Sequence, residues 1–546
     1  MSFTPSISPI TENNKQLQEL LLDPGVELPP LLPALAFALN DLSVLPIDLS
    51  LDPSKTLEEQ GGLTVEEQEK VRLLAFAALQ RLRDEPLGNN NVSDDDLQKI
   101  MSWACGTDLN GSYLQMLKEE LSPNDNDLRS PDWVQTEVDE ERDFTVAVIG
   151  AGMSGILAAY RLKQAGVNFI LFEKNSGIGG TWLENTYPGC RVDVSNHVYC
   201  YSFMQKHDWP HFHSTQNVLL QYFNDCADIF GIRDNIRFGT NVSSAVWDEN
   251  EGNWNLEISS ENGEEIFACQ SVISAVGQLN RPSYPDIPGV DTYRRESWHS
   301  AHWNHDYDLS GKNVAVIGTG CSAVQFIPRV AEVAANTTIF QRTPNWLMPR
   351  PQYQQRLPES LLWCFDHIPH YHNWFRLHLF WRSHEGLLPR LELDPDWENP
   401  GDNSISSENH ELGLMLRLYL QSEFSEHPEL LEKVTPNFTL GAKRFVIDDG
   451  LWAETLRRDN VELCTEEITS ITETGIETVG GEHNEFDPNP SMTSYAVSTE
   501  RQEMQNRLGA GKKLSSVDAV ADELMYLDLE KSGTSKRCIL GYLWYG

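Results

Sequence analysis

The stretch FTVAVIGAGMSGILAAYRLKQAGVNFILFE, residues 144–173, decides the fold. An apolar run predicts a β-strand, a glycine-rich turn and a helical pattern follow, and a second apolar run delivers an acid. In this order Gly150 permits the tight turn, Gly152 lets a pyrophosphate approach the helix N-terminus, and Gly155 lets the helix pack on the strand. Glu173 is expected to accept hydrogen bonds from a ribose diol. The stretch therefore predicts a dinucleotide-binding unit.

The same order of elements occurs again between residues 312 and 343, with Gly318 and Gly320 in the turn. Where the first unit has an acid, the second has Arg342. A guanidinium suits a 2′-phosphate better than a bare ribose, so the first site is expected to bind FAD and the second NADPH. This pair predicts a flavoprotein that a nicotinamide reduces. The residues expected to bind the second cofactor are Gly318, Gly320, Ser322, Ala323, Gln325, Arg342 and Thr343.

Together the two units predict an α/β fold with two Rossmann-like dinucleotide-binding domains, one for FAD and one for NADP, and an N-terminal helical extension. The expected divisions are an acidic extension with its linker at 1–140, the FAD domain at 141–285, the NADP domain with a helical insertion at 286–460, a return to the FAD domain at 461–487, and an atypical tail at 488–546.

Charge and composition narrow the class of protein. The 546 residues carry a net charge of −40, which repels phosphate backbones and excludes a nucleic-acid partner. The apolar stretch at 28–42 is too interrupted by proline and polar residues to span a membrane, and no basic region precedes it as in a signal peptide. The 9 cysteines include no C-x-x-C pair, which suits a reducing compartment, so a cytoplasmic location is expected.

The extension carries much of the charge, with 26 acidic and 9 basic residues in positions 1–140. Helical periodicity predicts one helix over Val65–Arg83 and a second helical stretch over Asp94–Leu121, with Ser93 as its N-cap. Such amphipathic helices are packing elements. We expect them to pack on the main body or on another subunit, the latter giving a homodimer.

Residues 179–193, GGTWLENTYPGCRVD, resemble the signature of type I Baeyer–Villiger monooxygenases at every fixed position. A second family signature is matched in part, by His299 and Trp303 but not by Arg295 or Asn304. The N-terminal extension resembles that of hydroxyacetophenone-type members. The resemblance implies an FAD- and NADPH-dependent insertion of one oxygen atom of O₂ next to a ketone carbonyl. The residues expected to bind the flavin cofactor are Gly150, Gly152, Ser154, Gly155, Glu173, Gly180, Thr181, Trp182, Tyr187, Asp193 and Tyr199.

The same resemblance assigns roles to a Lys-Arg pair. It implies that Lys443 joins Arg342 and Thr343 at the 2′-phosphate, and that Arg444 and Asp193 are the catalytic residues. A fixed cation in a cleft that excludes water stabilises the negative charge that develops during oxygen transfer.

Three further features bear on function. The histidines at 367, 370 and 372 lack matching Cys or acid ligands, so no metal is expected. The aromatic stretch Leu361–Trp381 is interpreted as a helical cap of the NADP domain. From residue 488 the sequence departs from the family and is expected not to replace the last strand of the flavin domain. N- or S-oxygenation, or a non-catalytic remnant, therefore stay open as alternatives.

Overall fold

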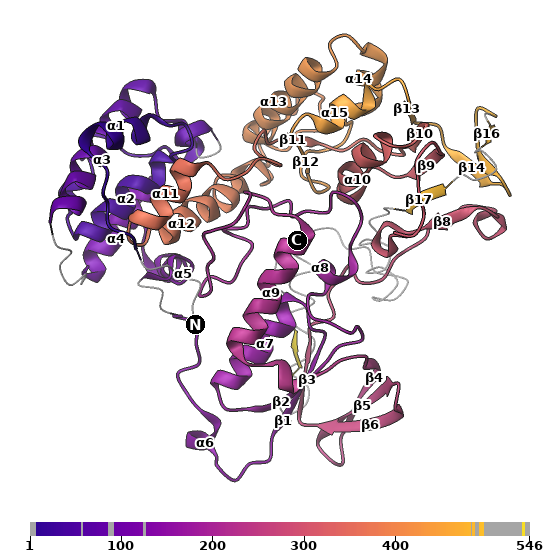
Figure 1. Cartoon of the computed structure of the whole chain (residues 1–546), viewed down its shortest axis with the longest axis horizontal. Coiled ribbons are helices and arrows are strands. Elements are labelled where there is room, and N and C mark those ends of the chain that lie inside the picture. The colour runs from indigo at the N-terminus through magenta and orange to yellow at the C-terminus, as the bar shows by residue number, and fades with distance from the viewer. Residues whose placement is uncertain are drawn as a thin grey trace.

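The computed structural model describes residues 7–55, 58–85, 92–123, 127–481, 483–485, 491–495 and 538–540. Within them, one group of helices lies on one side of the molecule and two α/β units lie on the other (Figure 1). The predicted α/β class is confirmed. No helix of this described part is long and apolar enough to cross a membrane.

The first α/β unit is built on a five-stranded sheet whose strands are all parallel, in the order β18-β7-β1-β2-β3. Helices α7 and α9 pack against each other and lie beside this sheet in Figure 1. An antiparallel meander, β4-β5-β6, adjoins it. The elements are β1 (Thr145–Ile149), α7 (Met153–Gln164), β2 (Asn168–Phe172), α8 (Thr181–Glu184), α9 (Gln216–Phe230), β3 (Ile236–Arg237), β4 (Asn241–Asp248), β5 (Asn253–Ser260), β6 (Gly263–Cys269), β7 (Ser271–Ser274) and β18 (Cys538–Leu540).

The second unit repeats the plan with a parallel sheet in the order β13-β10-β9-β17-β8. Further helices and two small sheets surround it. The elements are β8 (Glu296–Trp298), β9 (Asn313–Ile317), α10 (Cys321–Ala331), β10 (Asn336–Phe340), β11 (Leu347–Pro349), α13 (Ser407–Glu423), α14 (Pro428–Val434), β12 (Val446–Asp448), α15 (Leu451–Leu456), β13 (Val461–Cys464), β14 (Ile468–Ile471), β15 (Gly475–Thr478), β16 (His483–Glu485) and β17 (Ser491–Tyr495).

Two expectations about the C-terminal part need correction. Residues 461–464 do not return to the first unit, because β13 pairs in parallel with β10 in the second sheet. The stretch after residue 488 also contributes one strand to each of the two five-stranded sheets. β17 pairs with β9 and β8, and β18 pairs with β7 beside β1. The backbone at 538–540 thus takes the strand position that we expected to be lost.

The helical group combines the extension with two later helices. Its elements are α1 (Asn14–Leu22), α2 (Leu28–Leu39), α3 (Val65–Asp84), α4 (Asp94–Cys105), α5 (Gly111–Leu121), α11 (Glu359–His367) and α12 (Tyr371–His384), with the short α6 (Gln135–Val138) in the linker. The stretch predicted as one helical segment from Asp94 is two helices, since Gly106 ends α4 in the left-handed conformation. A Cβ there would lie 2.1 Å from the Leu51 carbonyl oxygen. Ser93 caps α4 as predicted.

The aromatic stretch that contains α11 and α12 does not cap the NADP domain. Instead α12 packs against α2 and α5. The rings of Phe37 and Trp374 lie 5.8 Å apart, and the Tyr371 hydroxyl donates to the Glu27 carbonyl at 3.2 Å. The residues of α2 from Leu28 to Ala38 are buried and almost all apolar, so this helix requires apolar partners on several sides, and α12 supplies one of them.

The buried Arg376 joins the helical group to the first unit. Arg376 of α12 is 3% exposed and donates to Glu120 of α5 at 3.0 Å. Its other terminal nitrogen donates to the carbonyls of His197 and Val198 at 2.8 and 3.0 Å. The same loop carries Tyr199. Helices of the extension thereby hold a loop of the predicted flavin site through one guanidinium.

Replacing Arg376 by methionine should therefore be destabilising, by about 2–4 kcal/mol, because the buried Glu120 keeps only Arg129 as a charge partner and the carbonyls of His197 and Val198 lose their donor. Arg294→Met is the matched control: Arg294 pairs with Glu473 at 2.9 Å, but the two side chains are 73% and 60% exposed. That change should cost no more than about 1 kcal/mol. Thermal and urea unfolding midpoints measure both variants, and similar midpoints would contradict the role of Arg376.

Candidate cofactor and active site

The two glycine-rich turns have nearly the same backbone conformation. Gly150 has φ +101° and Gly318 has φ +102°, a region that only glycine adopts without strain. The amide of each donates to the carbonyl at the end of the next strand, Phe172 at 2.8 Å and Phe340 at 2.9 Å. The repeat found in the sequence is thus a repeat in geometry.

Close approach explains why glycine stands at two positions of the first turn. A Cβ on Gly155 would lie 1.8 Å from the Gly150 carbonyl oxygen, so α7 could not pack on β1 with any larger residue. At Gly152, in contrast, a Cβ would make only an ordinary contact, 3.6 Å from the Gly180 Cα. Packing within the protein does not require glycine at 152. Approach of a pyrophosphate does, and the turn therefore fits the FAD that was predicted here.

The N-termini of α7 and α10 are both open to an anion. Each helix starts after a glycine, Gly152 or Gly320, and neither has a side-chain hydrogen bond to its first amides. Three positions in the first turns of these helices carry short side chains: Ser154, Ser322 and Ala323. Unpaired amides and the helix dipole favour a phosphate at such ends.

The Glu173 side chain binds the backbone of the first glycine-rich turn. It is 4% exposed, and its two oxygens accept from the amides of Ala151 at 2.7 Å and Asn175 at 2.8 Å. Each carboxylate oxygen has a second lone pair. The side chain is therefore held in place by the backbone while it retains acceptor capacity for a ribose hydroxyl.

Aromatic side chains of the segment at 180–199 lie next to this turn. Gly180 lies against Gly152, where a Cβ would be 2.9 Å from the Gly152 Cα, and Thr181 is exposed at the start of α8. The buried Trp182 indole donates to the Tyr199 hydroxyl at 3.2 Å, with the two rings nearly perpendicular at 82°.

Asp193 lies where the two units meet. Its Oδ1 accepts from the Gln325 amide at 2.9 Å and from the Tyr353 hydroxyl at 2.8 Å. Burial raises the pKa of the Asp193 carboxyl, while the Tyr353 hydrogen bond and the positive charge of Arg444 act in the opposite direction. The positive charge of the exposed Arg444 therefore acts on Asp193, and the catalytic role of this pair stays a prediction.

Gln325 of α10 connects the second unit to this part of the first unit. Its oxygen accepts from the Tyr187 hydroxyl at 3.0 Å and the Arg191 amide at 3.2 Å. Its nitrogen also reaches the Arg191 carbonyl at 3.1 Å. Glycine is required at 189, since a Cβ there would lie 2.6 Å from the Gln325 carbonyl oxygen. Gln325, predicted to bind a cofactor, in this structure contacts protein groups of both units.

The two cations predicted to hold a 2′-phosphate lie near each other. Arg342 and Lys443 are exposed, and Thr343 follows the former directly. Burial, and then the positive charge of Arg342, lowers the pKa of the Lys443 ammonium. The Lys443 nitrogen also lies 4.9 Å from the centre of the Phe438 ring. Two neighbouring cations repel each other, and a bound phosphate dianion would reverse that effect.

Sequence reasoning missed Tyr353 and Arg191. Tyr353 donates to Asp193, and the Arg191 guanidinium lies 5.4 Å from the Tyr353 ring and donates to its carbonyl at 3.0 Å. Tyr353 lies in a proline- and glutamine-rich loop without motif spacing, so no signal marked it. His299 forms a local turn, where its Nδ1 accepts from the Ala301 amide at 3.1 Å. The described part of the chain holds no cluster of three or more His, Cys, Asp or Glu side chains suited to a metal.

Comparisons with known proteins agree with this geometry. The family of flavin-binding monooxygenase-like proteins matches residues 143–364. An uncharacterized monooxygenase of Sinorhizobium fredii is 32% identical over 431 residues, which is 79% of this chain and 64% of that protein. A Baeyer–Villiger monooxygenase of Pseudomonas aeruginosa is 34% identical over 349 residues, 63% of this chain and 62% of that protein.

Solved structures show the same relationship. The complex of OTEMO with FAD and NADP superimposes with a TM-score of 0.53 at 28% identity, over 64% of this chain and 71% of that one. The chain spans less than two thirds of the length of the two curated relatives. In sequence and in fold the chain is similar to flavoprotein monooxygenases of the Baeyer–Villiger kind, and the OTEMO structure among them holds both FAD and NADP.

Proposed function

We propose that this chain is an NADPH-dependent flavoprotein monooxygenase that converts a ketone to an ester or lactone. The reaction consumes one ketone, one O₂, one NADPH and one proton, and it yields the oxygenated product, NADP⁺ and water. The observation that carries the proposal is the joint presence of two glycine-rich turns of the same conformation and, where the two units meet, the Asp193 carboxyl held by Gln325 and Tyr353. The ketone and O₂ are its proposed small-molecule partners.

When bound, the flavin supplies the redox chemistry with O₂. The chain's own residues bind the two cofactors, orient them and stabilise the charge that develops. The amides at the starts of α7 and α10 bind the two pyrophosphates, and Glu173 orients the ribose of the first cofactor. Arg342 and Lys443 bind the 2′-phosphate of the second.

Arg444 is proposed to stabilise the negative charge that develops on oxygen during transfer to the carbonyl carbon. Asp193 orients that guanidinium and is itself held by Gln325 and Tyr353.

The visible absorption spectrum of the purified chain tests the proposal, followed by NADPH addition without oxygen. Flavin bands that bleach, and then return with O₂ while a ketone gains one oxygen atom, are the expected result. A colourless protein after reconstitution with FAD would overturn the proposal. Oxygen added to an amine or sulfide, with the ketone unchanged, would favour N- or S-oxygenation instead.

Arg342→Ala should weaken NADPH binding by about 1–3 kcal/mol and leave NADH binding nearly unchanged, because the substitution removes charged hydrogen bonds to the 2′-phosphate only. Titration of both dinucleotides measures the preference. Arg294→Ala is a suitable control, since the Arg294 side chain is 73% exposed and pairs with the exposed Glu473 at 2.9 Å. An unchanged preference in Arg342→Ala would refute the phosphate assignment.

Arg444→Ala should abolish oxygenation while flavin reduction by NADPH stays measurable, since hydride transfer does not need the cation that oxygen transfer needs. Stopped-flow absorbance under nitrogen, and product analysis in air, separate the two half-reactions. Arg458→Ala, at a surface pair with Glu454, should leave both intact. Equal loss of both half-reactions in Arg444→Ala would contradict the assigned role.

A further inference from the structure

The segment at 437–442 leads directly into Lys443 and Arg444, yet it forms neither helix nor strand. Side chains from elsewhere bind its backbone instead. Three of its carbonyls accept a hydrogen bond from a side-chain nitrogen: Asn437 from Asn403 at 2.9 Å, Phe438 from Trp346 at 3.1 Å and Leu440 from Asn409 at 3.2 Å. The course of this segment is therefore set by its donors rather than by its own regular structure.

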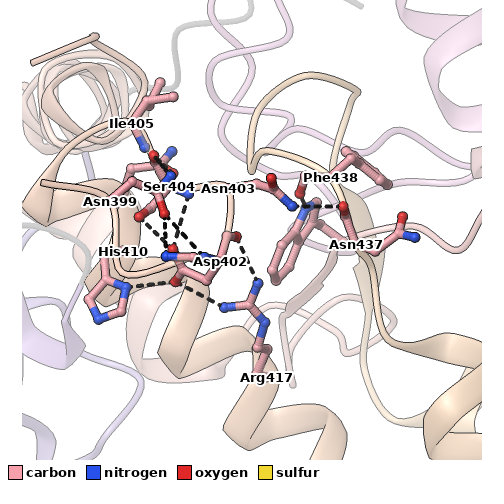
Figure 2. A network of polar contacts seen from close by, with 12 residues as sticks. Asn399, Asp402, Asn403, Ser404, Ile405, His410, Arg417, Asn437 and Phe438 are labelled. Atoms are coloured by element: carbon pink, nitrogen blue, oxygen red, sulfur yellow. Dashed lines mark hydrogen bonds and ion pairs between the residues drawn. The ribbon is translucent and has the colours of Figure 1, made fainter. Parts of the chain in front are cut away.

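Asp402 organises the donors (Figure 2). It accepts from the Ser404 hydroxyl at 2.6 Å, pairs with His410 at 2.7 Å and pairs with Arg417 at 3.3 Å. Burial alone would raise the pKa of the Asp402 carboxyl, but hydrogen bonds from Ser404 and His410 bring it well below its ordinary value. The carboxylate thus fixes the loop at 399–405, which we call the Asp402 loop.

Two connections run from the Asp402 loop to the segment. Asn403, held at φ +64°, donates directly to the Asn437 carbonyl. Arg417, which also donates to the Asp402 carbonyl at 3.3 Å, places its guanidinium 5.0 Å from the centre of the Trp346 ring. Trp346 in turn donates to the Phe438 carbonyl.

The held segment contacts Lys443 itself. The Phe438 ring, whose carbonyl Trp346 binds, lies 4.9 Å from the Lys443 nitrogen. Gly441 has φ +88°, and a Cβ there would lie 2.5 Å from the Leu391 side chain, so the backbone turns at one fixed point before the lysine. A displacement of the segment would displace Lys443 relative to Arg342.

We propose that Asp402 and Asn403 are positioning residues for the dinucleotide: the Asp402 loop fixes the segment at 437–442 so that Lys443 faces the 2′-phosphate together with Arg342. This inference rests on the proposed NADPH site and deepens it. It assigns part of the preference for NADPH over NADH to residues that touch neither cofactor.

Asn403→Gly tests the direct connection. Glycine retains the positive φ but removes the donor to Asn437, and loss of about one net hydrogen bond corresponds to about a fivefold change. Calorimetric titration of the purified chain with NADP⁺ and NAD⁺ is expected to show that rise in Kd for NADP⁺ only. Asn40→Gly is the matched control, because Asn40 is also exposed and left-handed, at φ +50°, but ends α2 in the extension.

Asp402→Asn tests the organising charge while it preserves shape, and about a tenfold weaker binding of NADP⁺ is expected, with NAD⁺ binding changed less than about twofold. Hydrogen exchange at the amides of 437–442 should become faster in both variants and not in Asn40→Gly. Exchange reports on the segment without cofactor and without turnover.

The outcomes separate the two proposals. If the wild-type chain prefers NADP⁺ and Lys443→Ala reduces that preference, but both loop variants keep it, this inference falls and the NADPH site stands. Equal weakening of NADP⁺ and NAD⁺ in the loop variants would also overturn it, since that pattern indicates general disorder. A wild-type chain that binds both dinucleotides equally would overturn both proposals.

Discussion

The side-chain amide of Gln325 is the contact on which the relation between the two α/β units depends. It extends from the first turns of α10 in the second unit and binds the Tyr187 hydroxyl, the backbone of Arg191 and the Asp193 carboxylate of the first. An amide has donors at one end and acceptors at the other, and Gln325 uses both ends. Rotation of one unit against the other would break several hydrogen bonds at once. Together with Tyr353, which donates to the same carboxylate, Gln325 thereby helps to fix the distance between the two glycine-rich turns.

Charge distribution gives the second constraint. A chain with a net charge of −40 repels a phosphorylated dinucleotide at long range. Binding must then come from short-range contacts, and the structure supplies these as uncapped helix N-termini and as the neighbouring cations Arg342 and Lys443. At about 0.1 M salt, repulsion from charges farther away than roughly 10 Å is largely screened. Local cationic sites can therefore bind a phosphate inside an acidic surface.

Sequence reasoning succeeded where a motif states a backbone requirement. The two glycine-rich turns, the helix N-cap at Ser93 and the contact of Gly155 with the strand follow from steric rules that hold in any fold. It failed where the partner is distant in the chain. Nothing in the aromatic stretch around Trp374 indicates that α2 lies beside it, and nothing near residue 538 indicates β7. Such pairings depend on the whole topology, which no local pattern contains.

The Asp193 region shows the same division. The signature that contains Asp193 could be recognised in the sequence. The Tyr353 hydroxyl that donates to Asp193, however, lies 160 residues further along the chain, in a loop without a motif. The network around Asp402 was likewise invisible, because its residues are common loop formers. Side-chain donors to backbone carbonyls carry no spacing rule, so only coordinates reveal them.

The packing of α2 against α12 has a consequence for synthesis of the protein. Helix α2 ends at Leu39, while α12 ends at His384, 345 residues later (384 − 39). At roughly 5–20 residues per second, a ribosome needs about 17–70 s to cover that interval. During this time one apolar side of α2 faces solvent or a chaperone. The nascent N-terminal helices are therefore a binding target for holding chaperones until the middle of the chain emerges.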